Sequence, residues 1–166
     1  MRPTDAAEEG LVLRPASPHD RPAMAVVQRR ARVVAAMPDV TLATAAQELA
    51  QGWDGDEFWV AQERGEVVGY VRLVRPDAMR EGWLDDLYVL PEAAGRGVGT
   101  ALLDLVKGLL RDGFGLWVHA SNSSARAFYR ARGLDEVELV PAWESPRGES
   151  EVRVTWRRVP PVGGLA

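Results

Sequence analysis

The chain has 166 residues, of which 27% are charged and 46% hydrophobic, values that are typical of one globular domain. It contains no cysteine, which excludes disulfides, thiolate metal sites and cysteine nucleophiles. No apolar run approaches the ~18 residues of a membrane span, and a formal net charge of -4 argues against general nucleic-acid binding. Because no basic and apolar leader opens the chain, we expect a cytoplasmic protein without membrane or nucleic-acid partners.

Strand and helix patterns alternate irregularly along the chain. A strand is predicted at 11–14, and two helices follow at about 21–35 and 41–51, separated by a loop around Met37 that we expect to lie over a site. The strand patterns on either side of Gly65 predict a hairpin. The predicted elements after the second helix are strands at 58–61, 67–74 and 83–90, a helix at about 99–111, a strand at 116–118, a helix at 123–132, and an antiparallel pair at 137–140 and 151–156.

This order predicts an α+β, or mixed α/β, fold rather than a regular doubly wound sheet. We expect a single domain over residues 11–157. The composition of residues 1–10 and 158–166 predicts flexible ends.

A glycine-rich loop lies between a strand and a helix, in the stretch Leu90 to Thr100, LPEAAGRGVGT. In such an arrangement, unpaired N–H groups and the helix dipole face an anion, and glycine allows a close approach. Arg96 adds a positive charge suited to a phosphate. The spacing matches neither the P-loop nor the dinucleotide-binding fingerprint. A tight turn that only reverses the chain is the alternative.

Two stretches make the sequence recognisable. Residues 83–100, WLDDLYVLPEAAGRGVGT, resemble motif A of the GCN5-related N-acetyltransferases (GNAT), and residues 122–134, NSSARAFYRARGL, are similar to motif B of that family. The resemblance covers about residues 11 to 157. Ala94 departs from the family pattern, which has Gln or Arg there, and predicts weaker or altered coenzyme affinity at most. Leu134 replaces a phenylalanine.

The resemblance implies a central, mostly antiparallel mixed sheet of six to seven strands, with splayed fourth and fifth strands and about four flanking helices. It implies acetyl-CoA as the cofactor, with its pyrophosphate at the glycine loop and its pantetheine arm along the preceding strand. The backbone N–H of Val89 would face the thioester carbonyl, as an oxyanion contact. The implied cofactor-binding residues are Tyr88, Val89, Leu90, Gly95, Arg96, Gly97, Val98, Gly99, Thr100, Asn122, Ala125 and Phe128.

Two adjacent carboxylates, Asp85 and Asp86, are candidates for the base. Acyl transfer needs a neutral amine, so a nearby carboxylate that accepts its proton is useful. Carboxylates are disfavoured within a strand, and on an ideal strand these two would point to opposite faces unless the strand bulges. The resemblance favours Asp85 as base or ammonium-binding group, with Asp86 second. A pairing with an arginine at a sheet edge is the structural alternative.

Tyr129 is implied by the resemblance as the general acid that protonates the leaving thiolate, and a phenol suits this role. A core aromatic is the alternative. Asn122 is expected to cap the following helix, to bind the pantetheine arm, or both.

Other polar and aromatic residues carry weaker expectations. His119 is a candidate for touching the acceptor or shuttling a proton, with an incidental position at a strand end as the alternative. Trp53 and Trp143 are candidates for walls of an acceptor pocket, with core or incidental packing as the alternative for each. Two separated histidines predict no metal site.

The sequence thus predicts an enzyme, an N-acetyltransferase, that transfers acetyl directly to a primary amine of a small molecule such as a polyamine or an aminoglycoside. A protein or peptide acceptor and a non-catalytic acyl-CoA-binding module are the alternatives. The final strand pair offers a contact for a possible homodimer.

Overall fold

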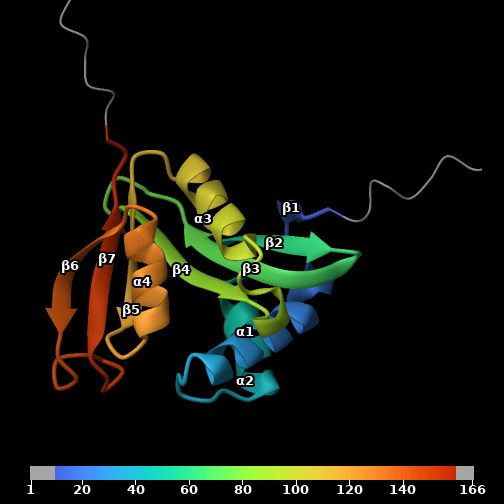
Figure 1. Ribbon diagram of the computed structural model, residues 1–166, viewed down its shortest axis with the longest axis horizontal. Helices are drawn as coiled ribbons and strands as arrows, with labels where there is room; N and C mark the ends of the chain where they lie inside the picture. The colour runs from blue at the N-terminus through green and yellow to red at the C-terminus, as the bar shows by residue number, and fades with distance from the viewer. Residues whose placement is uncertain (1–9, 160–166) are drawn as a thin grey trace, which may run out of the picture.

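The computed structural model describes residues 10–159, so the expected flexible ends lie almost wholly outside it. The strands are β1 (Val12–Pro15), β2 (Glu57–Glu63), β3 (Glu66–Val74), β4 (Gly82–Val89), β5 (Phe114–His119), β6 (Asp135–Val140) and β7 (Glu151–Trp156). The helices are α1 (Arg21–Val34), α2 (Leu42–Gly52), α3 (Val98–Leu109) and α4 (Ser123–Ala131), with short 3-10 helices at Pro18–Asp20 and Pro91–Ala93 (Figure 1). The predicted order of elements is confirmed.

All strands belong to one seven-stranded sheet in the order β1-β2-β3-β4-β5-β7-β6. Every neighbouring pair is antiparallel except β4 and β5, which are parallel. The α+β fold with a mostly antiparallel mixed sheet is therefore confirmed.

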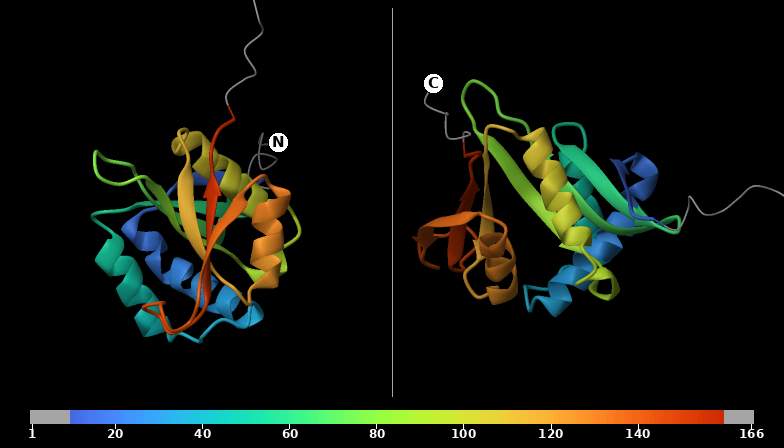
Figure 2. Two further views of the ribbon diagram at one scale, coloured as in Figure 1. Left: turned by 90° about the vertical axis from the view of Figure 1, so that its left-hand side faces the viewer. Right: turned by 45° about the horizontal axis from the view of Figure 1, so that its top comes forward.

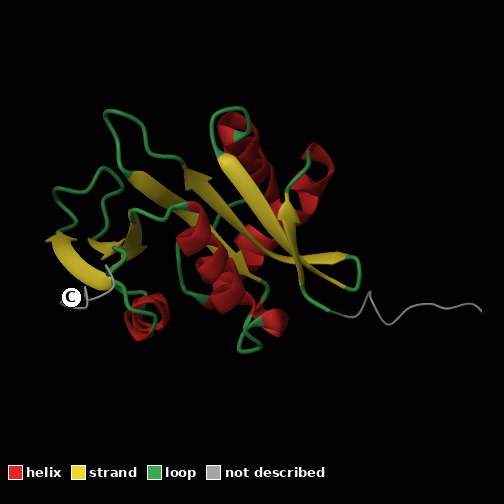
Figure 3. Cartoon of the chain, turned by 90° about the horizontal axis from the view of Figure 1, so that it is seen from above, coloured by secondary structure: helices red, strands yellow, loops and turns green. Residues whose placement is uncertain are grey.

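Hydrophobic cores lie on both faces of the sheet. Along β2, Phe58 and Val60 pack with α1 and α2, whereas Trp59 and Ala61 face the core that contains α3 and α4. This alternation follows from the pleat of a strand, which turns successive side chains to opposite faces. Figures 2 and 3 show the helices on the two sides of the strands. A strand buried on both faces is a rigid support for residues at its end.

The sheet opens between β4 and β5. These strands pair only at their beginnings, where Gly82 lies opposite Phe114 and Trp83 opposite Gly115. A Cβ atom at Gly115 would overlap the Trp83 ring, so glycine is needed for this close approach. Beyond it the two ribbons diverge (Figure 1), which confirms the expected splay and leaves the inner edge of β4 without a partner strand.

Within residues 10–159, no helix combines the length and the apolar character needed to cross a membrane.

Candidate active site

The first cavity of the site lies beside the glycine loop. We call it the glycine-loop cavity; it has a volume of about 490 Å³. It is bounded by the end of β4, the start of α3, one face of α4 and the end of α1. Its lining residues include Leu87, Tyr88, Val89, Ala94, Gly95, Gly97, Gly99, Thr100, Asn122, Ala125, Phe128, Tyr129 and Arg132.

The backbone conformation or the close packing of the loop explains why each of its three positions is a glycine. Gly95 and Gly97 have φ angles of 78° and 87°, in the left-handed region that other residues rarely adopt. Gly97 is the N-cap of α3, so no side chain satisfies the first N–H groups of this helix. A Cβ atom at Gly99 would lie 3.3 Å from the Phe128 ring. The loop therefore forms a bare backbone cradle at a helix N-terminus, which fits a phosphate group.

The backbone of Val89 faces the open edge of β4. The next residue, Leu90, donates its N–H to the Val68 carbonyl at 2.8 Å, on the side of β3. Because successive N–H groups of a strand point to opposite edges, the Val89 N–H points toward the gap between β4 and β5. A donor at this position suits the carbonyl oxygen of a bound thioester.

Three side chains of the predicted cofactor set do not line the glycine-loop cavity. Arg96 donates to Glu63 at 2.9 Å, outside the cavity, so its side chain is not positioned at the glycine loop as the sequence led us to expect. Val98 is 1% exposed and Leu90 packs on the cores, and only their backbone remains available.

The guanidinium in the cavity belongs to Arg132, which the sequence analysis missed. It donates to Thr100 Oγ1 and to the Phe128 carbonyl, both at 2.9 Å, and stacks over the Phe128 ring at 3.8 Å. No carboxylate among residues 10–159 pairs with it. The signal in the sequence was its spacing, one helical turn after Phe128.

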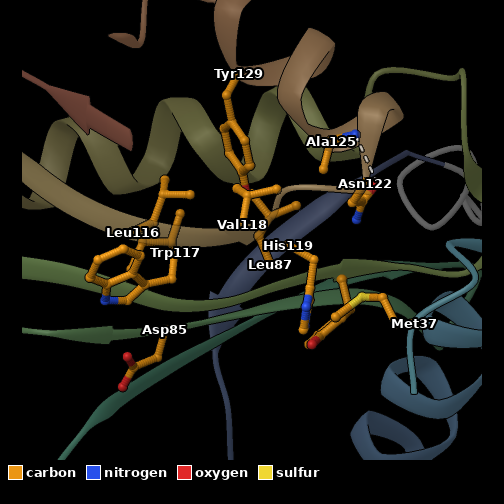
Figure 4. Close-up of a pocket in the computed structure, with 12 residues that line it drawn as sticks. Met37, Asp85, Leu87, Leu116, Trp117, Val118, His119, Asn122, Ala125 and Tyr129 are labelled. Carbon is orange, nitrogen blue, oxygen red and sulfur yellow. Dashed lines mark hydrogen bonds between the residues drawn. The ribbon is translucent and has the colours of Figure 1, made fainter. Parts of the chain in front are cut away.

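Tyr129 lies where the cavities meet. A small cavity of about 80 Å³, here called the central passage, runs between β4 and β5 and is lined by Asp85, Leu87, Tyr88, Trp117, His119, Asn122 and Tyr129 among others. Figure 4 shows the Tyr129 ring pointing from α4 into this passage, with Asp85 on its other side. Burial raises the pKa of Tyr129 above its ordinary value, so the phenol stays protonated.

Asn122 caps α4 as expected. Its side-chain oxygen accepts the N–H of Ala125 at 3.1 Å, and the residue borders both the central passage and the glycine-loop cavity. The cap thereby fixes the first turn of the helix that carries Phe128 and Tyr129.

A β-bulge places the two aspartates on one site. On β3, Arg72 lies opposite Asp86 while the next residue, Leu73, lies opposite Leu84, so Asp85 is the extra residue of β4. Both carboxylates line a third cavity, called the acidic cavity, of about 740 Å³. The condition stated from the sequence, that both can face one site only if the strand bulges, is met.

The two carboxylates differ in their surroundings. Asp86 accepts a hydrogen bond from the Tyr70 hydroxyl at 3.1 Å, and desolvation raises its pKa to about 6 against the opposing effect of Arg72. The Asp85 pKa is also raised by desolvation, and its Oδ2 lies 3.7 Å from Arg72 Nε. Arg72 is itself held by Asp56, with Nη2 at 2.6 Å from Oδ2. A carboxylate with a pKa of about 6 is ionised at neutral pH and can act as a base.

The remaining walls of the acidic cavity come from distant segments. The loop at Met37 and Pro38 and the β6–β7 connection at Arg147 and Glu149 border it, so the expectation that the first loop lies over a site is confirmed. His119 is at its edge, with Nδ1 2.6 Å from Glu149 Oε2. Among residues 10–159, no group of three or more His, Cys, Asp or Glu side chains is arranged to hold a metal ion.

The tryptophan that borders the acidic cavity is Trp117, not either of the two tryptophans expected. Trp53 stacks on Phe58 in the core with α1 and α2, and Trp143 is 84% exposed and borders no part of the three cavities. Both expectations were wrong, because polar flanks in the sequence do not show where a ring points. Trp117 borders the acidic cavity and the central passage.

The chain is similar to several known acetyltransferases. An uncharacterized N-acetyltransferase, MJ1207, from Methanocaldococcus jannaschii is 31% identical over 99 residues, covering 54% of this chain and 44% of that protein. Aminoglycoside N(6')-acetyltransferase type 1 from Stenotrophomonas maltophilia is 34% identical over 120 residues, covering 65% and 77%. The crystal structure of the PaiA N-acetyltransferase of Thermoplasma acidophilum in complex with coenzyme A superposes with a TM-score of 0.72 at 17% identity, covering 90% and 99%.

The chain spans less than half the length of the first of these relatives. Other relatives are named for mycothiol and for peptidyl-lysine acetylation, so their names do not agree on one acceptor. The family model described as "Acetyltransferase (GNAT) family" matches residues 31–134, which contain the glycine loop, both aspartates and Tyr129. The protein belongs to the GNAT acetyltransferase family.

Proposed function

We propose that this protein transfers an acetyl group from acetyl-CoA directly to a primary amine of a small cationic molecule. The observation that carries the proposal is the central passage, because it joins a backbone cradle for phosphates to a cavity lined by carboxylates. Acetyl-CoA is the acetyl donor that GNAT acetyltransferases use.

The residues present fit this donor. The backbone of the glycine loop and the Arg132 guanidinium would hold its phosphates, and the open edge of β4 would hold its pantetheine arm. When bound, acetyl-CoA supplies an activated acetyl group as a thioester. The Val89 N–H, which points toward the gap between β4 and β5, would stabilise negative charge on the acetyl oxygen.

On the acceptor side, the aspartates divide two tasks. Asp85, which borders both the passage and the acidic cavity, would bind the incoming ammonium. Asp86, with a pKa of about 6, would accept the proton that the amine must lose, directly or through a water. An alkyl ammonium with a pKa near 10.4 costs roughly 4 to 5 kcal/mol to deprotonate at pH 7. Asp86 would accept the proton as the C–N bond forms, when the nitrogen becomes much more acidic.

Tyr129 would donate its hydroxyl proton to the departing sulfur. Its raised pKa keeps it a hydrogen-bond donor at every working pH. Because the passage connects the glycine-loop cavity to the acidic cavity, the amine would attack the thioester directly, without a covalent enzyme intermediate.

The proposal of a small cationic acceptor rests on the excess of negative charge in the acidic cavity, whose lining contains five carboxylates and three guanidinium groups. A panel of monoamines, diamines, aminoglycosides and lysine-containing peptides, with acetyl-CoA and detection of released thiol, tests it. We expect release with small cationic amines. Thiol release with peptides alone would show that the acceptor is a peptide and not a small molecule. Release with none of these amines would contradict the proposed transfer to a primary amine.

Replacing Arg132 with glutamine is expected to weaken coenzyme A binding by roughly five- to thirtyfold, because a charge-assisted contact to a phosphate contributes ~1 to 2 kcal/mol. Calorimetric titration measures this, and the loss should shrink in high salt. 3'-Dephospho-coenzyme A identifies the phosphate concerned: an equal loss with this ligand indicates the pyrophosphate. Arg96→Gln, whose side chain lies outside the cavity, is the matched control and should bind normally.

A further inference from the structure

One end of the acidic cavity has no role in the proposed reaction. It is formed by α1 and α2, where Gln28, Glu48 and Gln51 line the wall. Gln28 is only 3% exposed, and its Nε2 donates to Glu48 Oε2 at 3.1 Å. Its Oε1 has no hydrogen-bond partner within residues 10–159. A buried amide oxygen without a donor is uncommon in proteins and calls for an explanation.

Reversing the Gln28 amide would not remove this orphan. The reversed amide would place its oxygen against the Glu48 carboxylate, and two acceptors repel each other. The orientation that satisfies Glu48 therefore leaves Oε1 unpaired. What this end of the cavity lacks is a hydrogen-bond donor.

The charges of the cavity point to a positively charged donor. Arg72 is paired with Asp56 and Asp85, and Arg147 lies 3.0 Å from Glu151. Glu48, by contrast, forms no ion pair within the described part of the chain. The negative charge of Glu48 is one of the causes that raise the pKa of Asp86. The two carboxylates therefore repel each other, and no cation of the described chain pairs with Glu48.

Arg32 is the cation of the protein nearest to this end in sequence, since it follows Gln28 by one turn of α1 on the same face. Its guanidinium also lines the acidic cavity, but it is held by the loop and forms no ion pair with Glu48 within residues 10–159. Nε and Nη2 donate to the Pro38 carbonyl at 3.1 and 2.9 Å, which ties Arg32 to the loop after α1. Glu48 therefore has no cation of the protein as its partner within residues 10–159, and the buried Gln28 oxygen near it has no donor.

We infer that Glu48 and Gln28 bind a second ammonium group of the acceptor, so that the acceptor is a compound with at least two amino groups. This inference rests on the proposed function, because it takes the reacting amine to lie at Asp85 and Asp86. This second ammonium donates hydrogen bonds to the Glu48 carboxylate and supplies the hydrogen-bond donor that the Gln28 end of the cavity lacks. A monoamine lacks this contact.

Calorimetry on the protein with bound coenzyme A tests the inference, with 1,5-diaminopentane and pentylamine as probes. Glu48→Gln removes the charge and keeps a hydrogen-bonding side chain beside Gln28. We expect the dissociation constant of the diamine to rise roughly three- to tenfold, as for a partly exposed ion pair, with pentylamine unchanged. Asp104→Asn, an exposed acid on α3 outside the cavities, is the control and should change neither.

Glu48→Asp provides a second and independent variant. It keeps the charge but shortens the side chain by one methylene, so the preferred diamine should become longer. An equal loss for both probes in Glu48→Gln, or an unchanged diamine affinity, would overturn the second ammonium site. Thiol release measured on the same samples with acetyl-CoA separates the two proposals: release with pentylamine supports transfer whatever happens at Glu48.

Discussion

Replacing Tyr129 with phenylalanine is expected to lower kcat by roughly 10²- to 10³-fold, the usual contribution of a positioned general acid. The ring is 7% exposed and packs in the core, so phenylalanine preserves the packing and removes only the hydroxyl. That hydroxyl makes no hydrogen bond within residues 10–159 and borders the central passage, so its loss leaves no protein group unpaired. Steady-state kinetics of thiol release measures the effect.

The affinity of the variant for coenzyme A distinguishes a role of the Tyr129 hydroxyl in catalysis from a role in coenzyme binding. The glycine loop and Arg132 are unchanged in the variant, so calorimetry should give the same dissociation constant as in the wild type. An acceptor whose amine is already neutral at the assay pH should not rescue the rate, because the missing proton belongs to the departing thiol. Equal losses in binding and turnover, or no loss in either, would exclude Tyr129 as the acid.

Much of the fold could be predicted because local signals agree with it. The alternation of β2 and β3, the glycine at their turn and the helical spacing after Gly99 each depend on neighbours in the sequence. The glycine loop was also readable, since positive φ angles at Gly95 and Gly97 require the residue type that the sequence shows. At these positions the residue type and its neighbours in the sequence are enough to predict the local structure.

Side-chain direction was harder to predict. Arg96 lies among the glycines, yet it reaches Glu63 on β2, a partner 33 residues away in sequence. The Asp85 bulge depends on the register against β3, and sequence reasoning gave only the condition for it. Trp117 was missed because the strand predicted at 116–118 was not divided into its two faces, and its alternation turns the tryptophan away from its buried neighbours. Such contacts depend on tertiary structure.

Replacing Asp86 with asparagine is expected to lower kcat/KM at pH 8 by roughly 10²-fold and to change the pH profile. In the wild type, the carboxylate must be ionised to accept a proton. Its pKa of about 6 therefore predicts a rate that falls about tenfold per pH unit below pH 6. The asparagine variant has no such group, so this acid limb should disappear.

Asp85→Asn is the matched comparison, because it removes the neighbouring carboxylate of the same cavity. If Asp85 binds the ammonium, its loss should raise KM and leave the acid limb in place. A limb that persists in Asp86→Asn and disappears in Asp85→Asn would exchange the two roles. A limb that persists in both variants would assign the titration to another group and remove Asp86 as the base.

Stability separates a chemical role of Asp86 from simple unfolding. Its pKa is raised in the folded protein, so between about pH 4 and pH 6 the folded state keeps a proton that the unfolded chain has lost. The free energy of unfolding therefore decreases as the pH rises through this window, and the cost of holding the ionised carboxylate persists at neutral pH. Asparagine avoids that cost and can still accept the Tyr70 hydroxyl. Thermal melts should thus show the variant gaining stability over the wild type between pH 4 and pH 7, while its activity is lost, as expected for a destabilising group retained for catalysis.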